Sequence, residues 1–253
     1  MMKWVLKGIQ TGIKTTSYPP ALETAPGISP GRPKEQKWGE EDSTHSLVGI
    51  CPTGALKEAD KGISVDYARC IHCYRCKRQT PTPMFWEESF EWAEATNKSE
   101  ALQSPFSRSL HIRIVDAGAC GACLSEIKQL NNPYYNIHRL GFFITPTPRS
   151  ADVLLVAGPL TDHMRNALKK TYQAMPTPKR ILAVGTCALS GGVFGPSFAA
   201  GAGVADLLPV DVKVPGCPPP PLALIHALLL LAGRSQRNPM KSSPEGYARE
   251  DRR

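Results

Sequence analysis

The chain has 253 residues and a formal net charge of +8, from 30 Lys and Arg against 22 Asp and Glu. This length allows one sizeable core and a smaller second domain, and no apolar run reaches the roughly 18 residues of a membrane-spanning helix. A basic surface can bind nucleic acid, anionic lipid or an acidic partner. Interleaved aromatic residues of an RNA-binding kind are absent, so we expect no nucleic acid.

The eight cysteines all lie between residues 51 and 217. An even number could form four disulfides in a secreted protein. However, the N-terminus lacks the continuous apolar segment and the cleavage site of a signal peptide, and short C-x-x-C spacings are more typical of metal binding. We therefore interpret the cysteines as two sets of four metal-ligating thiols, which implies a reducing compartment.

Residues 1–20 are expected to form an amphipathic helix that Tyr18-Pro19-Pro20 ends. An apolar face and a neighbouring stripe of lysines recur at helical spacing, formed by Met2, Leu6, Ile9 and Ile13 and by Lys3, Lys7 and Lys14. Two interpretations stay open. The helix lies on a membrane or a membrane subunit, or it packs on its own domain.

Residues 21–80 contain the first group of cysteines, after an arm at 21–45 that we expect to be irregular. Bacterial ferredoxins use C-x2-C-x2-C-x3-C-P, and the fourth cysteine ligates the other cluster. Cys51 and its following proline match the fourth position, and Cys70, Cys73 and Cys76 match the first three. These four cysteines are expected to hold one [4Fe–4S] cluster in a small ferredoxin-like α+β segment. The alternative is a zinc site of four cysteines; we interpret His72 as a surface residue.

Residues 81–108 are predicted to be a linker whose aromatic side chains pack between two domains. Residues 109–233 follow as an α/β domain, and 234–253 as a basic polar tail. Strands are expected at 112–116, 152–157, 180–184 and 211–214, with a possible strand within 137–144. Helices are expected at 124–130, 161–174 and 219–232, the last of them buried because it is apolar nearly all round. Apolar strands alternating with helices predict a parallel sheet covered on both faces.

Three cysteines of this domain, Cys120, Cys187 and Cys217, each follow the end of a predicted strand, and Cys123 lies one turn beyond Cys120. The carboxyl ends of parallel strands meet at one edge of the sheet, where such folds bind ligands. The pattern therefore predicts one site that contains all four thiols. The alternative is four unrelated buried cysteines.

Residues 112–232 resemble the small electron-transfer subunit of membrane-bound, complex-I-like [NiFe] hydrogenases, including the formate hydrogenlyase type. The wider family includes the 20-kDa-type subunit of NADH:quinone oxidoreductase. The resemblance lies in DAGACGACLSEI (116–127), NPYYNIHRLGFFITPTPRSADVLLVAGPLTDHM (132–164), AVGTCALSGGVF (183–194) and VDVKVPGCPPPP (210–221). It implies a flavodoxin-like fold with one [4Fe–4S] cluster, the last relay before the large subunit's active site, held by Cys120, Cys123, Cys187 and Cys217.

The N-terminal stretch TGIKTTSYPP (11–20), with the cysteines after it, resembles the ferredoxin-type subunit of the same complexes. The chain is therefore interpreted as a fusion of a half-emptied ferredoxin with the small subunit.

Some positions depart from the family pattern. The C-x-x-C spacing at Cys120 favours the hydrogenase side over the quinone reductases, whose first two ligands are adjacent. However, Leu124 follows the motif with the acid at Glu126, and Ser150 stands where the family tends to have His. Complexes of this build exist whose large subunit lacks nickel ligands, and these departures keep such a complex as the alternative. For Glu126 two interpretations stay open: a proton or partner contact, or an acid of a helix's first turn stabilised by the helix dipole. For Arg149 the two interpretations are a pairing with Asp152 and a position facing the partner's active site.

The expected function is that of an electron-transfer subunit in an oxidoreductase complex. The chain would relay electrons through two [4Fe–4S] clusters to or from the catalytic large subunit of a membrane-associated hydrogenase-type complex, with no bond-making site of its own. The alternative is the same relay in a complex-I-like quinone-reducing or nickel-free complex. Expected partners are the large subunit, a membrane subunit and a further ferredoxin-type or donor subunit. The expected location is peripheral, on the cytoplasmic side of the cell membrane. A different class, a zinc-stabilised structural or nucleic-acid-binding protein, is suggested only by the charge of +8.

Overall fold

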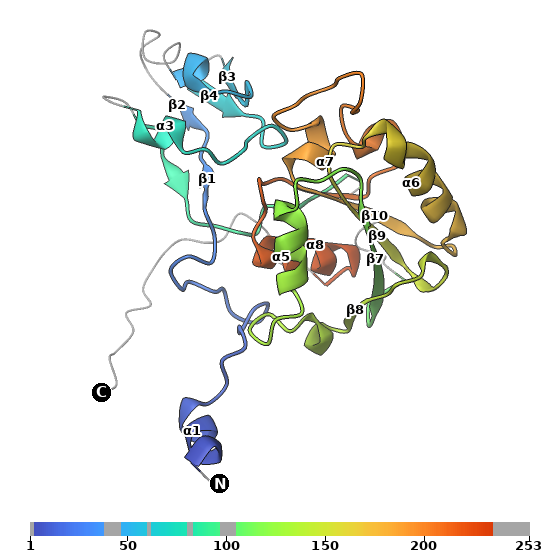
Figure 1. Ribbon diagram of the computed structural model, residues 1–253. Helices are drawn as coiled ribbons and strands as arrows, with labels where there is room; N and C mark the ends of the chain where they lie inside the picture. The colour runs from blue at the N-terminus through green and yellow to red at the C-terminus, as the bar shows by residue number, and fades with distance from the viewer. Residues whose placement is uncertain (1–2, 38–46, 60–61, 80–82, 97–104, 235–253) are drawn as a thin grey trace.

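A computed structural model describes residues 3–37, 47–59, 62–79, 83–96 and 105–234 (Figure 1). Its largest element is a six-stranded sheet in the order β6-β11-β10-β9-β7-β8. The strands are β6 (Glu94–Ala95), β7 (Leu110–Asp116), β8 (Phe142–Ile144), β9 (Val153–Ala157), β10 (Arg180–Val184) and β11 (Val212–Val214). All neighbours are parallel except β6, which runs antiparallel to β11. With β7 counted as the first strand, the five parallel strands have the flavodoxin-like order 2-1-3-4-5. The predicted parallel sheet is confirmed.

The central strands are apolar because both faces of the sheet are covered. All five residues of β9 are buried; Val153, Leu155 and Ala157 face one core cluster, and Leu154 and Val156 face the other. The first cluster is covered by α5 (Ala122–Gln129) and α8 (Pro221–Leu231), and the second by α6 (Asp162–Ala174) and α7 (Thr186–Ser190). Ten of the eleven residues of α8 are buried, as its all-round apolar sequence predicts.

The predicted linker contributes a strand to the sheet. Residues 94–95 form β6, which pairs antiparallel with β11. Without β6, β11 would be the edge strand and its outer backbone groups would be unpaired. Just before it, Phe90 and Trp92 are buried in the cluster of α5 and α8, whereas Phe85 is exposed. The expected aromatic packing is present, but 81–108 is not only a linker.

The segment before the large sheet has a small core of its own. A three-stranded antiparallel sheet is formed by β2 (Gln36–Lys37), β4 (Gly62–Val65) and β3 (Leu56–Ala59), beside the short helix α3 (Arg75–Arg78). Leu47, Leu56, Ile63, Val65, Cys76 and Met84 form its buried cluster. The arm predicted to be irregular supplies β1 (Arg32–Pro33), which pairs with β5 (Trp86–Glu87). Pairing with a partner distant in the sequence makes these two residues of the arm a strand.

The N-terminal helix is shorter than expected. Helix α1 spans Lys3–Thr11 and ends at Gly12, whose φ of 65° suits a helix C-terminus, rather than at Tyr18-Pro19-Pro20. None of its residues is buried, and Figure 1 shows it extending away from the sheet. Tyr18 itself is buried against the edge of the Phe90 ring, with ring centroids 5.0 Å apart. The interpretation in which the helix packs on its own domain is therefore wrong.

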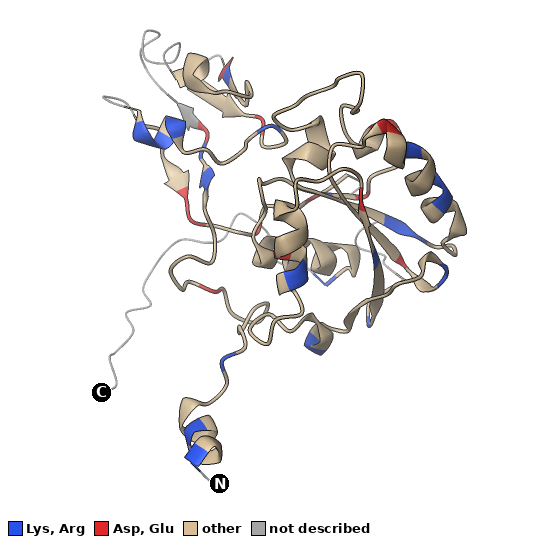
Figure 2. Ribbon diagram, in the orientation of Figure 1, with Lys and Arg blue, Asp and Glu red and all other residues tan. Residues whose placement is uncertain are grey.

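The described basic residues lie on separate elements, including α1, α3 and α6 (Figure 2). In the described part of the chain, no helix is long and apolar enough to cross a membrane. Most of the predicted basic tail, residues 235–253, lies outside the described residues.

Candidate functional site

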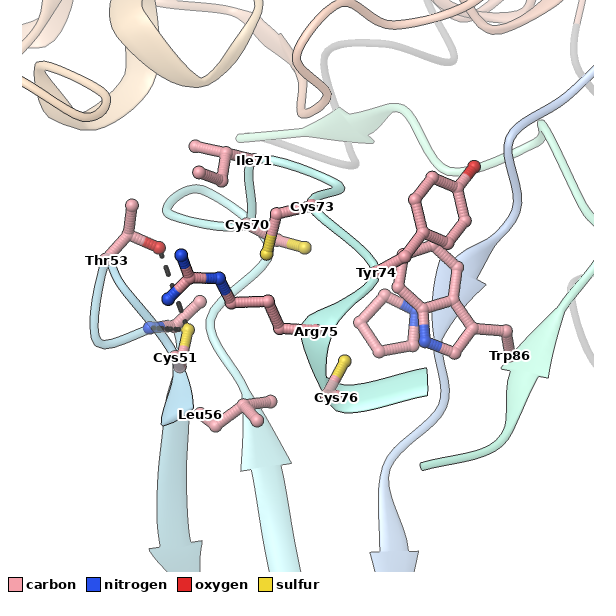
Figure 3. A pocket seen from close by; sticks show the side chains of 12 residues that line it. Cys51, Thr53, Leu56, Cys70, Ile71, Cys73, Tyr74, Arg75, Cys76 and Trp86 are labelled. Carbon is pink, nitrogen blue, oxygen red and sulfur yellow. Dashed lines mark hydrogen bonds between the residues drawn. The ribbon is translucent and has the colours of Figure 1, made fainter. Parts of the chain in front are cut away.

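The first cysteine set, Cys51, Cys70, Cys73 and Cys76, surrounds a single cavity. All four side chains line it, together with others that include Thr53, Leu56 and Trp86 (Figure 3). Cys51 precedes β3, Cys70 and Cys73 lie in the loop after β4, and Cys76 lies in α3. The structure therefore brings together the four thiols that the interrupted ferredoxin pattern groups.

The loop that carries three of these thiols has an unusual backbone. His72 and Tyr74 have φ values of 52° and 60°, a left-handed conformation that costs energy for residues other than glycine. Such strain persists where the surroundings impose it, and it is frequent at functional sites. Here it turns the chain so that Cys70, Cys73 and Cys76 reach the cavity from successive turns.

Hydrogen-bond donors already point at a sulfur of this set. The Ala55 amide donates to the Cys51 Sγ at 3.2 Å, and the Thr53 hydroxyl lies 3.8 Å from it. Burial raises the pKa of Cys51, but these bonds and the amides of Thr53 and Leu56 outweigh it, so the pKa is lowered. The Trp86 indole nitrogen is buried beside the cavity and faces the Cys76 thiol, where it lowers the pKa that burial raises. Donors directed at thiolates favour the ionised form that ligates metal.

The second cysteine set, Cys120, Cys123, Cys187 and Cys217, lies at the carboxyl edge of the large sheet. Cys120 follows β7, Cys123 is in α5, Cys187 is in α7 directly after β10, and Cys217 follows β11. The pKa of Cys123 is raised to about 12, first by burial and then by the nearby thiols Cys187, Cys217 and Cys120. The pKa values of Cys187 and Cys217 are also raised, first by burial and then by their neighbours in the set. The alternative of four unrelated buried cysteines is therefore wrong, because the thiols lie close enough to affect one another's pKa.

Two glycines leave space for the thiols of the second cysteine set. A Cβ on Gly185 would lie 2.5 Å from the Cys123 Sγ, and a Cβ on Gly192 would lie 2.7 Å from the Cys187 Sγ. Both glycines also have positive φ, 86° and 66°. Glycine is required here for the close approach of backbone to sulfur as well as for the turn.

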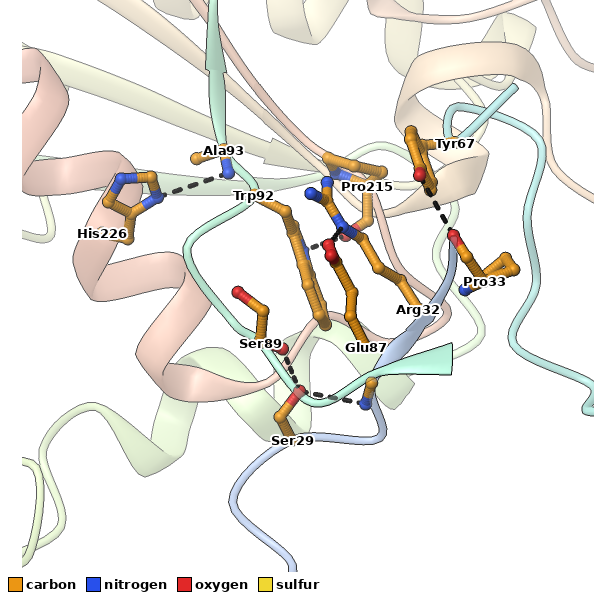
Figure 4. A network of polar contacts seen from close by, with 11 residues as sticks. Ser29, Arg32, Pro33, Tyr67, Glu87, Ser89, Trp92, Ala93, Pro215 and His226 are labelled. Atoms are coloured by element: carbon orange, nitrogen blue, oxygen red, sulfur yellow. Dashed lines mark hydrogen bonds and ion pairs between the residues drawn. The ribbon is translucent and has the colours of Figure 1, made fainter. Parts of the chain in front are cut away.

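A polar network joins the segments around the two sets (Figure 4). The Arg32 guanidinium pairs with Glu87 at 2.5 Å, and the Trp92 indole donates to the Pro215 carbonyl at 2.9 Å. The Ala93 amide donates to the His226 Nδ1 at 3.3 Å. These bonds fix the arm and the connector against the loop that carries Cys217.

The donor sets consist of thiols alone, the ligands of iron–sulfur clusters and of structural zinc. Among the described residues, no three His, Cys, Asp or Glu side chains form a group placed to hold a single metal ion. The first set instead encloses a cavity lined by all four thiols and by hydrogen-bond donors. The donor set of each site thus fits the ligand requirement of an iron–sulfur cluster and also that of structural zinc.

Comparison with known proteins identifies the second part of the chain. Residues 120–231 match the family described as NADH ubiquinone oxidoreductase, 20 Kd subunit. An uncharacterized protein of Methanocaldococcus jannaschii is 44% identical over 128 residues, which are 51% of this chain and 86% of that protein. The chain belongs to this family. The matched residues of this 20-kDa-type subunit begin at Cys120 and contain the whole second cysteine set, whereas the first set lies outside them.

Two further proteins are similar to this family member. Formate hydrogenlyase subunit 7 of Escherichia coli is 35% identical over 153 residues, 60% of this chain and 58% of that subunit. A chain in the structure of the membrane-bound sulfane sulfur reductase, described as an archaeal respiratory membrane complex, is 30% identical with a TM-score of 0.45. That match covers 51% of this chain and 73% of the other.

Glu126, predicted as a proton or partner contact, lies near the second set. It is half-buried in α5, and burial raises its pKa. The alternative, an acid of the first helical turn, is wrong because α5 begins at Ala122 and its first turn holds no acid. Its role as a contact stays a prediction.

Arg149 is not brought together with the cysteines. It is exposed in the short helix η2 (Pro148–Ser150). This helix directly precedes β9, so it lies at the amino ends of the parallel strands, whereas the cysteines lie at their carboxyl ends. Asp152 accepts hydrogen bonds from the His111 amide at 2.8 Å and faces the His111 ring at 3.3 Å. The structure shows these contacts in place of the suggested pairing with Arg149, whose contact with a partner stays a prediction.

Three residues near the sites were missed or misjudged. His72 is not a surface residue: it is half-buried, edge-on to Trp86 and Trp92, with ring centroids 5.9 and 5.7 Å apart. Trp86 was interpreted only as packing. Thr186 was not singled out, although it stands directly before Cys187 and its hydroxyl bonds to the Cys70 carbonyl. No sequence signal identifies that contact.

Proposed function

We propose that this chain is the electron-transfer subunit of a membrane-associated, hydrogenase-type complex, with one [4Fe–4S] cluster in each cysteine set. The observation that carries the proposal is that one chain folds two groups of four thiols into two adjacent sites. The first encloses a cavity, and the second occupies the ligand-binding edge of a flavodoxin-like sheet. The chain itself performs no bond-making chemistry in this proposal.

Clusters of this type supply reversible one-electron chemistry whose potential depends on hydrogen bonds to sulfur, burial and charge. The residues of this chain provide the first two of these influences. The Ala55 amide donates to the Cys51 Sγ, and the Trp86 indole lines the same cavity beside Cys76, whose pKa it lowers against the larger effect of burial. Around the second set, Cys123 is buried and Cys120 is exposed. The first site is therefore built as an enclosed position and the second as one open to a partner.

The proposed partner at the open side is the large catalytic subunit. Exposed aromatic side chains, Phe194 and Phe198, lie in the segment that follows α7, and Cys120 is exposed at the same sheet edge. The naming of the E. coli relative as a formate hydrogenlyase subunit supports a hydrogenase-type assembly. The further proposed partners are a membrane subunit and a ferredoxin-type or donor subunit.

Helix α1 is the proposed contact with the membrane subunit or lipid, on the cytoplasmic side. Trp4 and Ile9 are 75% and 74% exposed on a helix with no buried residue, and Lys3 and Lys7 flank them. Ile9→Glu should weaken association with the membrane fraction while leaving the free energy of unfolding unchanged, because Ile9 makes no core contact. Lys170→Gln is the matched control, because it changes the net charge by the same amount at an exposed position of α6, outside α1, and should leave membrane association unchanged. Equal membrane association of Ile9→Glu and the native chain would contradict the proposal.

A second candidate is the same relay in a quinone-reducing or nickel-free complex, favoured by Leu124 after the C-x-x-C motif and by Ser150. The large subunit that purifies with this chain discriminates the two. Two C-x-x-C pairs in that subunit identify a nickel–iron site, and their absence identifies the second candidate.

Electron paramagnetic resonance of the dithionite-reduced chain tests the relay. The native chain should show two interacting S = 1/2 signals, whereas Cys51→Ser and Cys187→Ser should each retain one signal and lose the interaction. Each variant serves as the control for the other, since each leaves the opposite set intact. A chain with bound zinc and no such signal would contradict the proposal and favour a structural role.

A further inference from the structure

The two cysteine sets meet at the N-terminal end of α7. The segment 66–73, which carries Cys70 and Cys73, lies against this helix. The Ser190 hydroxyl donates to the Ala68 carbonyl at 2.8 Å, and the Thr186 hydroxyl donates to the Cys70 carbonyl at 3.0 Å. Helix α7 therefore carries Cys187 of the second set and also holds the loop of the first.

Thr186 is the residue at this junction that contacts both sets. It is 1% exposed, and its hydroxyl lies 3.0 Å from the Cys70 carbonyl and 3.1 Å from the Gly216 carbonyl. Its own amide donates to the same Gly216 carbonyl at 2.9 Å. One hydroxyl hydrogen is thus shared between a cysteine of the first set and the residue before Cys217.

We propose that Thr186 is a positioning residue that fixes the Cys70 loop against the second cysteine set and provides the contact for electron transfer between the two sets. The path from Cys70 to Cys187 crosses a single hydrogen bond, from the Cys70 carbonyl to the Thr186 hydroxyl, and is otherwise covalent. The electron-transfer part rests on the proposed function, whereas the positioning part depends only on the fold.

The other contacts between the segments do not provide the same path. The Ser190 hydroxyl reaches the carbonyl of Ala68, which is not a cysteine, and the Trp92 indole reaches Pro215 from the connector. Thr186 alone among these donors precedes one cysteine in sequence and bonds to the backbone of another. Replacing its hydroxyl by a methyl group of similar size leaves two buried carbonyls without this donor, a change that is costly in a buried site.

Hydrogen–deuterium exchange of the full-length, reduced chain tests the positioning. Thr186→Val should raise the exchange rates of amides in residues 68–73 about fivefold or more, because one net hydrogen bond holds that segment closed. Thr186→Ser keeps the hydroxyl and should restore the native rates. Thr145→Val is the matched control, because it removes another buried threonine hydroxyl, one that bonds to Ser150 at 2.9 Å. Native rates in Thr186→Val, or equal changes at 68–73 in Thr145→Val, would overturn the positioning role.

Intramolecular electron transfer after pulsed reduction tests the second part. Thr186→Val should slow transfer between the sets several-fold at native iron and sulfide content, and Thr186→Ser should restore the rate. A native rate in Thr186→Val with both sets loaded overturns the electron-transfer contact alone. A chain that binds no iron and sulfide overturns the proposed function and this contact with it, while the exchange measurement still decides the positioning role.

Discussion

Glycines at two positions decide whether the thiols of the second cysteine set can take their places. Gly185 follows β10 with a φ of 86°, and its missing Cβ leaves space for the Cys123 Sγ. A side chain there would carry two separate costs, a left-handed backbone and a clash with a ligand sulfur. The clash would displace the Cys123 sulfur, so it would affect the binding site as well as the stability of the fold.

The Gly185→Ala variant should therefore fail to retain the cluster that we propose for the second set. Alanine in this conformation, with φ 86° and ψ 156°, costs about 1–3 kcal/mol of unfolding free energy, and the 2.5 Å contact with Cys123 displaces the thiol. Iron content should fall by about half, the share of one of two equal clusters. Gly195→Ala is the matched control, since its φ is 61° and nothing lies within 4 Å of its Cβ position. It should be destabilised similarly and keep its iron, and equal iron in both variants would contradict this account.

At the residue scale, the spacing of the cysteines predicted both sets. The ferredoxin pattern groups Cys51 with the C-x2-C-x2-C cysteines, and cysteines that follow parallel strands meet where the carboxyl ends of those strands lie. The contacts of Thr186, Trp86 and His72 were not predictable. Their partners, such as the Cys70 carbonyl and the Trp92 ring, are distant in sequence and come close only after folding. Glu126 was misplaced in the first helical turn because α5 begins two residues before its predicted start.

At the scale of elements, the connector and α8 are joined through a buried histidine. The Ala93 amide donates to the His226 Nδ1, so the ring accepts and must be neutral at that nitrogen. Burial lowers the pKa of His226 to about 4, whereas an unfolded histidine has a pKa of about 6.5. The neutral ring therefore stabilises the native chain above pH 6.5, and this stability is lost as the pH falls toward 4.

His226→Asn should remove this part of the pH dependence while keeping an acceptor for Ala93. Between pH 7 and 5.5 the native chain should lose about 1 kcal/mol more of its unfolding free energy than the variant, because the unfolded histidine takes up a proton that the folded one does not. Urea unfolding at several pH values measures the difference. The comparison also cancels the contribution of His72, whose pKa burial likewise lowers to about 4. If the unfolding free energies of the native chain and the variant change equally with pH, His226 does not contribute to the pH dependence of stability.

Element prediction succeeded where the apolar pattern was long and failed where pairing decided the structure. The expected strands at 152–157 and 180–184 correspond to β9 and β10 within a residue, because both are continuous apolar runs. β6 and β1 have two residues each and exist through their partners β11 and β5. The end of α1 was misplaced because Gly12, rather than the later prolines, ends the helix.

At the scale of the whole molecule, the chain combines a small part built on an antiparallel sheet with an α/β part that matches the 20-kDa subunit family. The two parts are joined by the arm, the connector and α7, and the cysteine sets lie on either side of this junction. The family match covers only the second set. For the first set, the support for a cluster lies in its cavity, its hydrogen-bond donors and the spacing of its cysteines.

The presence of two clusters is tested most directly by measuring anaerobic iron and acid-labile sulfide per chain. The account predicts about eight of each, since two clusters of four iron and four sulfide are held by eight thiols. It also predicts about four of each in Cys51→Ser and in Cys187→Ser, in which the opposite set remains. Bound zinc without labile sulfide in the native chain would contradict the account.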